Sequence, residues 1–305
     1  MNNYMELIGI KAKKSCENRL NTKKKNLVLN DYAKLLDKEK KFIIRENLKD
    51  IKFAKKIKLK ENLINRLQLD REKLNSIKNS IKKIAKLKDP VNNTLEKWKR
   101  PNGLTISRIT IPIGVIGVIY ESRPNVTSDV ASLCFKSGNA VILKGGSEAL
   151  NTNKALAKLF RKALKKNKVD ENFIQFIDSK QKKIVDIMLS KMRDYIDVII
   201  PRGGKGLVKK VQEISKIPII GHLEGLCHTY IDKDAGLKMA IEVVHNAKLR
   251  NTSICGATET ILMHKNIVKK FSNPILQKLE KNGCKIFGDQ ILRKYYKGRL
   301  FPATE

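Results

Sequence analysis

Cys255 is the residue of this sequence best suited to nucleophilic chemistry. It lies in the run Asn251-Thr-Ser-Ile-Cys-Gly-Ala-Thr258, whose small and hydroxylated residues predict a loop between a helix and a strand. A cysteine thiolate attacks carbonyl carbon readily, and the thioester that forms remains reactive towards hydride. The alternative is a buried structural cysteine, because free cysteine often packs as a small hydrophobe. The rest of the chain has to decide between the two.

Two glycine-containing segments are candidates for binding phosphate. Lys144-Gly-Gly-Ser147 and Pro201-Arg-Gly-Gly-Lys-Gly-Leu207 each follow an expected strand and precede an expected helix. Glycines let backbone amides approach an anion, the helix N-terminus adds positive potential, and a cation completes the site. Neither segment fits the usual nucleotide-binding patterns. Asn125 also follows an expected strand, where it is either a functional amide or an ordinary N-cap.

Alternating apolar and helical segments indicate the fold that must position these residues. Short apolar runs predict strands near 113–120, 140–143, 173–177, 196–200, 217–220 and 227–231. Helices are expected between them near 126–137, 148–166, 181–191 and 206–215. This alternation predicts an α/β fold with a parallel sheet covered on both faces. Ligands of such sheets bind beyond the carboxyl ends of the strands.

The first third of the chain has a different pattern. Leucine, isoleucine and tyrosine recur at helical spacing from residue 3 to about 88, which predicts a helical N-terminal layer. A turn at Pro101-Asn-Gly103 then lies between two extended arms, so a β-hairpin is expected at about 95–109. An exposed hairpin of this kind either pairs with another subunit through its edge or caps a domain.

Composition limits the class of protein. The 305 residues, 41% hydrophobic, predict a folded chain of about two domains. We expect a cytoplasmic protein without a membrane span, because no apolar run is long enough and the first ten residues do not resemble a secretory signal. The five cysteines are an odd number and form no Cys-x-x-Cys pair. Neither a disulfide framework nor a metal site is therefore expected.

The strongly basic charge has two interpretations. The 64 Lys and Arg residues against 30 Asp and Glu give a net charge of +34, which attracts anions and nucleic acid without specificity. The lysines are spread along every expected helix, however, and no zinc-finger spacing or RNA-binding sheet motif is present. A solvated surface is favoured over specific nucleic-acid binding. A nucleic-acid-binding protein on an inactive enzyme scaffold remains the alternative from another class.

Five segments of the chain resemble one enzyme family. They lie at 115–134, 136–147, 199–207, 221–232 and around Cys255, and include Tyr-Glu-Ser-Arg-Pro-Asn and Gly-His-Leu-Glu-Gly-Leu-Cys-His. In this order they are similar to the gamma-glutamyl phosphate reductases, or glutamate-5-semialdehyde dehydrogenases, of the aldehyde dehydrogenase superfamily. The resemblance covers nearly the whole chain. An aldehyde or acyl-CoA dehydrogenase with another substrate is the alternative within the superfamily.

The resemblance implies an activity and a domain plan. The activity is NADPH-dependent reduction of L-glutamate 5-phosphate to L-glutamate 5-semialdehyde and phosphate, the second step of proline biosynthesis from glutamate. The plan is an NADPH-binding domain with N-terminal helices at 1–233, followed by a catalytic domain at 234–305. Because relatives continue beyond Glu305, the catalytic domain is expected to be incomplete and the chain, truncated at its C-terminus, poorly active alone. A homo-oligomer in the complete protein and a functional link to glutamate 5-kinase are also implied.

The same resemblance assigns roles to individual residues. Cys255 is the implied nucleophile, and the Asn125 side-chain amide with the Cys255 backbone N–H is the implied oxyanion hole. Lys144 matches the superfamily lysine at the adenosine ribose, and with Ser147 it is our candidate for the 2′-phosphate. The 201–207 loop is expected beside the pyrophosphate. The expected cofactor residues are therefore Lys144, Gly145, Gly146, Ser147, Arg202, Gly203 and Gly204.

Five further residues have weaker interpretations. His222 is nearest to the place where hydrolytic relatives carry a general-base glutamate, with Glu224 close by, and a reductase has no use for an activated water. His222 and His228 are expected to pack or hydrogen-bond rather than to act as acids or metal ligands. Arg123 and Arg250 are candidates for the substrate's phosphate or α-carboxylate, because a guanidinium binds both groups. Structural salt bridges are the alternative for both arginines.

Overall fold

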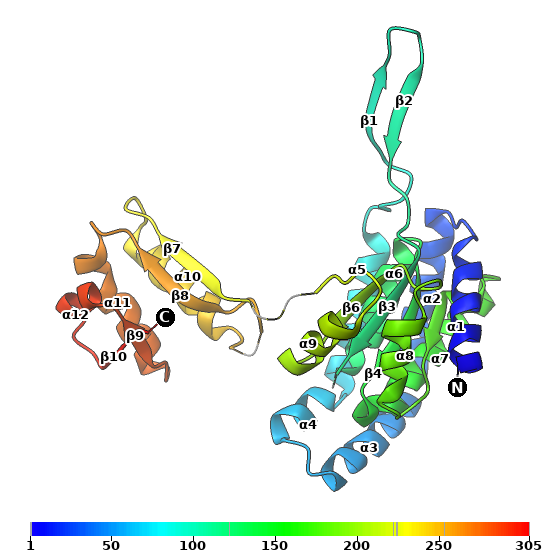
Figure 1. The fold of residues 1–305 in the computed structure, drawn as a ribbon. Helices are drawn as coiled ribbons and strands as arrows, with labels where there is room; N and C mark the ends of the chain where they lie inside the picture. Colours follow the sequence, from blue (N-terminus) through cyan, green and yellow to red (C-terminus); the bar gives the residue numbers. More distant parts are fainter. Residues whose placement is uncertain (1, 122, 222, 224, 253, 305) are drawn as a thin grey trace. The chain divides into compact units, whose positions relative to one another are not determined.

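The computed structural model describes residues 2–121, 123–221, 223, 225–252 and 254–304. Two compact units make up the chain, Met1–Gly221 and His222–Glu305. Each unit has a hydrophobic core of its own. The two units are therefore described one at a time (Figure 1).

A parallel sheet forms the centre of the first unit. Its strands are β3 (Val115–Tyr120), β4 (Ala140–Gly145), β5 (Ile174–Phe176) and β6 (Val198–Arg202), in the spatial order β5-β4-β3-β6. Every residue of β3 and β4 is buried, as expected for parallel strands covered on both faces. This arrangement confirms the predicted α/β class.

Helices follow each of these strands. They are α6 (Pro124–Lys136), α7 (Leu150–Lys166), α8 (Lys183–Lys191) and α9 (Lys205–Ile214). The strand expected at 217–220 is wrong, because Ile219 forms only an isolated bridge with Ile199. Pro218 explains the difference, since proline has no N–H to donate to a strand ladder. The carbonyl of Pro218 still accepts a hydrogen bond from the Ile199 N–H at 2.8 Å.

In the described part of the chain, five helices precede the sheet. They are α1 (Asn2–Cys16), α2 (Thr22–Lys38), α3 (Lys40–Lys56), α4 (Glu61–Leu67) and α5 (Arg71–Lys86). Helix α5 begins after Asp70, whose side chain accepts a hydrogen bond from the Lys73 N–H at 2.7 Å and caps the helix. Its buried residues Leu74, Ile77 and Ile81 recur at helical spacing, so one face packs inward. Helix α5 packs against α2 and α6.

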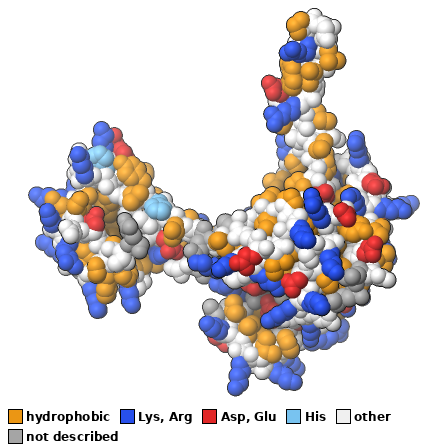
Figure 2. All heavy atoms as spheres, in the orientation of Figure 1, with side chains coloured by type: hydrophobic (Ala, Val, Ile, Leu, Met, Phe, Trp, Pro, Cys, Tyr) orange, Lys and Arg blue, Asp and Glu red, His pale blue; other side chains and the backbone are white. Residues whose placement is uncertain are grey.

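An exposed β-hairpin extends from the first unit (Figure 1). It consists of β1 (Thr94–Lys99) and β2 (Thr105–Ile109), paired antiparallel around a turn in which Gly103 has a φ of +85°. All six residues of β1 are exposed. Apolar side chains are nevertheless frequent on the hairpin (Figure 2). Leu95, Leu104 and Ile109 are more than half exposed, and Trp98 is 38% exposed.

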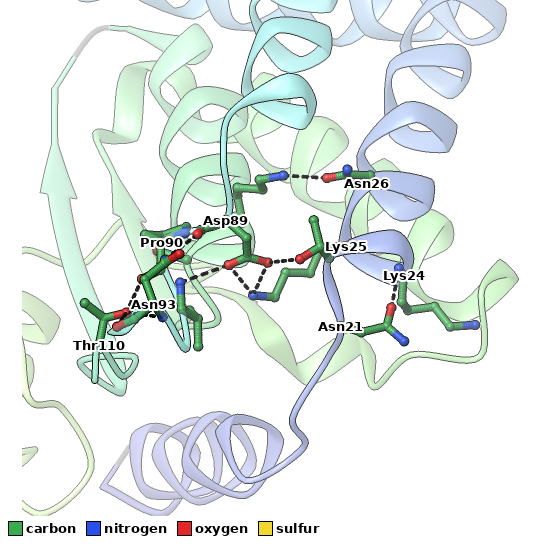
Figure 3. A network of polar contacts seen from close by, with 12 residues as sticks. Asn21, Lys24, Lys25, Asn26, Asp89, Pro90, Asn93 and Thr110 are labelled. Atoms are coloured by element: carbon green, nitrogen blue, oxygen red, sulfur yellow. Dashed lines mark hydrogen bonds and ion pairs between the residues drawn. The ribbon is translucent and has the colours of Figure 1, made fainter. Parts of the chain in front are cut away.

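A polar network connects the base of this hairpin to α2 (Figure 3). The buried Lys25 ammonium lies 3.0 Å from one carboxylate oxygen of Asp89 and 3.1 Å from the other. Burial alone would raise the pKa of Asp89, but hydrogen bonds from Thr22, the Val91 N–H and Lys25 lower it below its ordinary value. The Asn93 amide donates to the Asp89 carbonyl at 2.7 Å. These bonds fix the chain where it leaves the helical layer.

The second unit is a smaller α/β assembly. Strands β7 (Cys227–Ile231) and β8 (Thr258–Met263) pair in parallel, as do β9 (Ile286–Gly288) and β10 (Leu300–Pro302). Its helices are α10 (Leu237–Leu249), α11 (Val268–Lys281) and α12 (Gln290–Tyr295). A division after residue 233, expected from the resemblance, would separate β7 from its partner β8. By its contacts the chain instead divides at Gly221.

The lysine and arginine side chains are widely distributed on the surface. On the face shown in Figure 2, Lys and Arg side chains are spread over each unit rather than gathered in one stripe. Among the described residues, no helix has both the length and the apolar character that a bilayer crossing requires.

Candidate active site

The chain changes direction across the sheet of the first unit at strand β3. From β3 the chain passes to β4 and β5 on one side, and then to β6 on the other side of β3. The carboxyl ends of β3 and β6 meet at this switch point, where ligands of doubly wound folds bind. Tyr120 pairs with Arg202 in the ladder, and the Glu121 N–H donates to the Arg202 carbonyl at 3.2 Å. The segments containing Asn125 and the 201–207 loop therefore begin side by side.

Asn125 is the second residue of α6. Pro124 occupies the first position, where its missing N–H costs nothing, and Arg123 is the N-cap residue without a side-chain capping bond. The interpretation of Asn125 as an ordinary N-cap is therefore wrong. Its side-chain Nδ2 instead donates to Oδ2 of Asp129, one helical turn along, at 3.2 Å.

Asp129 is an unusual partner for this amide. Burial raises the pKa of its carboxyl, and interactions with the side chains of Asn125 and Ser80 lower it by less. Its other oxygen, Oδ1, is buried and has no hydrogen-bond partner among the described residues. A buried carboxyl oxygen without a hydrogen-bond partner lowers stability.

A buried hydrogen-bond chain joins the end of β3 to α6 and α7. The Tyr120 hydroxyl lies 2.7 Å from Oγ1 of Thr127, which donates to Oδ1 of Asn153 on α7 at 2.9 Å. Burial raises the pKa of Tyr120 above its ordinary value, so the phenol stays neutral. A Cβ on Gly145 would collide with the amide nitrogen of Asn153. A larger residue at the end of β4 would therefore require the Asn153 side chain to move.

Lys144 lies at the carboxyl end of β4 and is only 6% exposed. Its ammonium donates to the Gly145 carbonyl at 2.6 Å. Burial lowers the pKa of Lys144, and the nearby Glu148 carboxylate partly offsets that shift. A ligand phosphate at this strand end would compensate a cation that the protein leaves incompletely balanced.

The N-terminus of α7 is already occupied by a carboxylate. Asp50, on α3, accepts hydrogen bonds from the Asn151 N–H at 3.1 Å and the Thr152 N–H at 2.7 Å. It also accepts from the Asn151 amide at 2.8 Å and the Thr152 hydroxyl at 2.6 Å. The sequence interpretation counted this helix end as free positive potential for the 144–147 segment. The first amides of α7 serve Asp50 instead, so anion binding there depends on Lys144 and the loop itself.

A second carboxylate lies at the 201–207 loop. Gly204 is the N-cap residue of α9, and its N–H donates to Oε2 of Glu121 at 2.8 Å. A Cβ on Gly203 would come within 2.6 Å of the same oxygen. This glycine pair therefore accepts an anionic oxygen closely, and the exposed Arg202 adjoins it. The glycine pair and Arg202 could therefore hold an anionic group such as a phosphate.

Cys255 lies in the second unit, in a turn between α10 and β8. The turn is closed by the Ala257 N–H, which donates to the Ile254 carbonyl at 3.1 Å. Cys255 is exposed, which excludes the alternative of a buried structural cysteine. The Cys227 thiol, at the start of β7, donates to the Cys255 carbonyl at 3.2 Å. Gly225 adjoins the same carbonyl so closely that a Cβ there would lie 3.2 Å from its oxygen.

Other thiols of the chain differ from Cys255. Cys134 is buried, and burial raises its pKa to about 12. Cys16 is half-buried, and burial raises its pKa to about 11 even though it accepts a hydrogen bond from the Ala140 N–H. Both are held in the neutral, unreactive form at physiological pH. Among the described residues, no three His, Cys, Asp or Glu side chains are grouped closely enough to hold a metal ion.

The remaining candidates fall in different places. Arg123 lies in the first unit beside Asn125, whereas Arg250 caps the C-terminus of α10 in the second, five positions before Cys255. Nδ1 of His228 lies 2.8 Å from the Leu226 carbonyl, a local hydrogen bond. His222 and Glu224 lie outside the described residues. The structure therefore groups Asn125, Lys144–Ser147 and Arg202–Gly204 at one sheet edge, and Cys255 with Arg250 in the other unit.

Sequence reasoning missed several partners of these residues. Asp129 had a local signal, since it follows Asn125 by four positions on a predicted helix. Glu121 also had one, because it is a charged residue directly after an apolar strand. Asp50 and Cys227 had none, because each contacts a segment that is distant in the sequence.

Comparison with known proteins places the chain. A model of the aldehyde dehydrogenase family matches residues 12–290. Gamma-glutamyl phosphate reductase of Caldanaerobacter subterraneus subsp. tengcongensis is 41% identical over 292 residues, which cover 94% of this chain and 70% of that protein. The enzyme of the same name from Bartonella tribocorum is 45% identical over 265 residues, covering 87% and 64%. The chain thus spans about two thirds of the length of these curated relatives.

Solved structures agree with this placement. The crystal structure of gamma-glutamyl phosphate reductase from Thermotoga maritima has a TM-score of 0.90 and 36% identity, covering 98% of this chain and 72% of that one. The Saccharomyces cerevisiae enzyme has a TM-score of 0.66 and 29% identity, covering 98% and 79%. A propionaldehyde dehydrogenase from Rhodopseudomonas palustris, at 16% identity and a TM-score of 0.63, shares the fold over 95% of this chain and 62% of its own.

Proposed function

Because the chain belongs to the aldehyde dehydrogenase family and, within it, to the gamma-glutamyl phosphate reductases, we propose that it reduces L-glutamate 5-phosphate to L-glutamate 5-semialdehyde with NADPH. The single observation that carries the mechanism is the exposed Cys255 thiol in its turn between α10 and β8. The reaction belongs to proline biosynthesis from glutamate. Glutamate 5-kinase, which makes this acyl phosphate, is the proposed functional partner.

Cys255 performs the covalent step. Its thiolate attacks the acyl carbon of the substrate, a C–S bond forms, and the C–O bond to phosphate breaks with its electron pair passing to the leaving phosphate. The product is a γ-glutamyl thioester on Cys255 and free inorganic phosphate. Phosphate is a good leaving group, so this step needs little help from a general acid.

Asn125 stabilises the charge that develops on the acyl oxygen. Its Nδ2 belongs to a side chain held at the start of α6, and the Cys255 backbone N–H is the second proposed donor. Donors aimed at the oxyanion are worth about 10²- to 10³-fold in turnover each. Arg123 and Arg250 are proposed to bind the substrate's phosphate or α-carboxylate through bidentate guanidinium contacts.

The cofactor site is proposed at the sheet edge of the first unit. NADPH, when bound, supplies the hydride that converts the thioester to the aldehyde. Gly203 and Gly204 offer backbone approach to the pyrophosphate, as the closeness of the Glu121 carboxylate supports. Lys144, with Gly145, Gly146 and Ser147, is proposed to bind the adenosine ribose and its 2′-phosphate, where a buried ammonium favours a dianion.

The exposed hairpin supports a homo-oligomer. Strands β1 and β2 present unpaired edges and apolar side chains, including Trp98 and Ile109, to solvent. Exposed strand edges of this kind pair readily with another chain. We propose that a second copy of this protein occupies that edge.

The function is tested in the reverse direction, by phosphate-dependent reduction of NADP⁺ with glutamate 5-semialdehyde. The expected result is turnover that requires phosphate and is abolished in Cys255→Ser, while Cys284→Ser, a matched change in the same unit, retains it. NADPH binding is followed in parallel by cofactor fluorescence and should survive both changes. Turnover that persists in Cys255→Ser would exclude the thioester mechanism, and absence of NADPH binding would exclude the cofactor site.

A further inference from the structure

We propose that Asp129 is a positioning residue that holds the Asn125 side-chain amide in the orientation needed to donate to the reacting oxygen. The proposal rests on the function proposed above, in which Asn125 is an oxyanion donor. Asn125 cannot fix the orientation of its own amide, and the proposal assigns that role to Asp129 on the same helix.

The contact between Asn125 and Asp129 determines the orientation of the Asn125 side-chain amide. An asparagine side chain can turn over and exchange its oxygen for its nitrogen, because the two ends are nearly equal in size. Asp129 is a carboxylate one helical turn from Asn125, and as an acceptor it pairs only with Nδ2, which lies 3.2 Å away. Nδ2 carries two protons. When one of these protons is directed at Asp129, the direction of the second proton is fixed. The Asn125 carbonyl oxygen then cannot occupy the position of the amide nitrogen.

The surroundings of Asp129 show that this contact costs stability. Oδ1 is buried without a partner among the described residues, and burial raises the pKa of the carboxyl. A leucine of similar size would remove that cost, because an unbonded buried oxygen is more expensive than an apolar group. Residues that lower stability in this way are common at functional sites.

A purely structural role is the competing interpretation. Side-chain pairs four residues apart stabilise exposed helices by about 0.2–0.5 kcal/mol. Such a pair gains nothing from burying one oxygen of its acceptor, as Asp129 does. A purely structural role predicts that Asp129→Leu changes stability and leaves the orientation of the Asn125 amide unchanged, whereas the positioning role predicts that the amide changes its orientation.

The experiment compares four variants, with turnover measured in the complete protein. Asp129→Leu removes the acceptor, and Asp129→Asn retains an oxygen that accepts the same bond without the charge. Asn125→Ala removes the proposed donor. Ser132→Ala is the matched control, because Ser132 is a buried polar residue of α6 whose hydroxyl also lacks a partner among the described residues. Circular dichroism and thermal unfolding verify that each variant is folded.

Two measurements are made on each variant. The first is the NMR spectrum of the chain labelled with ¹⁵N-asparagine, in which Asn125→Ala identifies the side-chain amide signals of Asn125. The second is kcat and KM for phosphate-dependent NADP⁺ reduction. The amide spectrum reports orientation whatever the turnover, so it decides the proposal independently of the proposed function.

The expected results separate the variants. In Asp129→Leu the Asn125 amide signals move towards those of an unrestrained side chain, and kcat falls about 10- to 100-fold with KM nearly unchanged, because the misdirected donor acts mainly in the transition state. Asp129→Asn restores both to within about threefold, and Ser132→Ala changes neither. Unchanged Asn125 signals in Asp129→Leu would overturn the proposal. Altered signals there, together with full turnover in Asn125→Ala, would support the positioning and refute the oxyanion role.

Discussion

The thiol of Cys227 donates a hydrogen bond to the backbone carbonyl of Cys255 at 3.2 Å, although 28 positions separate the two residues. The bond joins the start of β7 to the turn that carries the nucleophile. A second cysteine of the chain therefore holds the backbone of the first.

This relationship predicts the effect of replacing Cys227. Cys227→Ala should lower the free energy of unfolding by less than about 1 kcal/mol, because S–H is a weaker donor than N–H or O–H. Cys227→Ser should lower it by less, because a hydroxyl still donates to the Cys255 carbonyl. Urea unfolding of both variants measures the difference. Equal losses in the two variants would show that packing, and not the bond, is what matters.

The thiols of Cys16 and Cys134 should make the stability of the fold depend on pH. The folded state raises the pKa of Cys16 to about 11 and of Cys134 to about 12, from an ordinary value of 9.0, and so binds their protons more tightly than the unfolded chain. Their contribution to stability is therefore complete below about pH 9 and is lost as the pH rises through the folded values. Buried Tyr32 and Tyr120, whose pKa values are also raised, act in the same direction.

Unfolding measured in urea between pH 8 and pH 11 tests this prediction. Stability should decline with rising pH, and the decline should be shallower in Cys134→Ala, which retains the tyrosines and Cys16. At pH 8 the exposed Cys255 should react with a thiol reagent while Cys134 stays protected. Rapid labelling of Cys134 in the folded chain would contradict its burial.

Asp50 should be important for the stability of the first unit. Asp50→Ala leaves two backbone N–H groups of α7 without their acceptor and should cost about 2–4 kcal/mol, the sum of a lost cap and unsatisfied buried donors. Asp50→Asn keeps one acceptor oxygen and should cost roughly half as much. Chemical denaturation measures both. A loss below about 1 kcal/mol in Asp50→Ala would mean that water replaces the carboxylate at little cost.

Glu121 should oppose cofactor binding. If a phosphate oxygen takes the Gly204 N–H, the Glu121 carboxylate must first release its 2.8 Å bond. Glu121→Gln removes the charge and should lower the Kd for NADPH about 3- to 10-fold, equivalent to a neutral instead of a charge-assisted bond. Glu213→Gln, on the same unit at α9, is the control and should leave the Kd unchanged. Weaker binding in Glu121→Gln would instead make Glu121 a ligand of the cofactor.

The hairpin provides its own reporter of association. Trp98 is the only tryptophan of the sequence and lies on β1, partly exposed. If a second copy covers this edge, tryptophan emission should move to shorter wavelength as protein concentration rises, in step with sedimentation. Ile109→Arg places a charge on the partner strand β2 and should keep the emission at long wavelength and the protein monomeric. A dimer whose tryptophan emission does not change would use another surface.

Features that depend on neighbouring residues in the sequence were easier to predict than features that depend on distant ones. The strand at 227–231 was predicted with the bounds of β7, because an apolar run with adjacent charges is a local signal. The run at 217–220 is entirely apolar, but Pro218 lacks the N–H that a strand ladder needs. The apolar pattern identified both segments as strand candidates. Whether a strand formed depended on the backbone N–H groups that each segment can donate.

The environment of the candidate site was less predictable. Glycine loops and a lone thiol can be recognised from residue types, and the resemblance assigned their roles. The carboxylates of Asp50 and Glu121 could not be placed, because the amides they bind are 101 and 83 positions away. Both occupy helix N-termini that the sequence interpretation regarded as available to a ligand, since a helix end attracts any nearby anion, including one from the protein itself.

The separate hydrophobic cores have a consequence for how the protein denatures. The larger cluster is built from residues up to Ile217, and the smaller one from Ile231 onwards. The two clusters share no residue. We therefore expect each unit to unfold cooperatively by itself, rather than the whole chain in one step. Heating or urea should accordingly produce two transitions, and the nucleophilic turn should lose its order in the transition that leaves the four-stranded sheet standing.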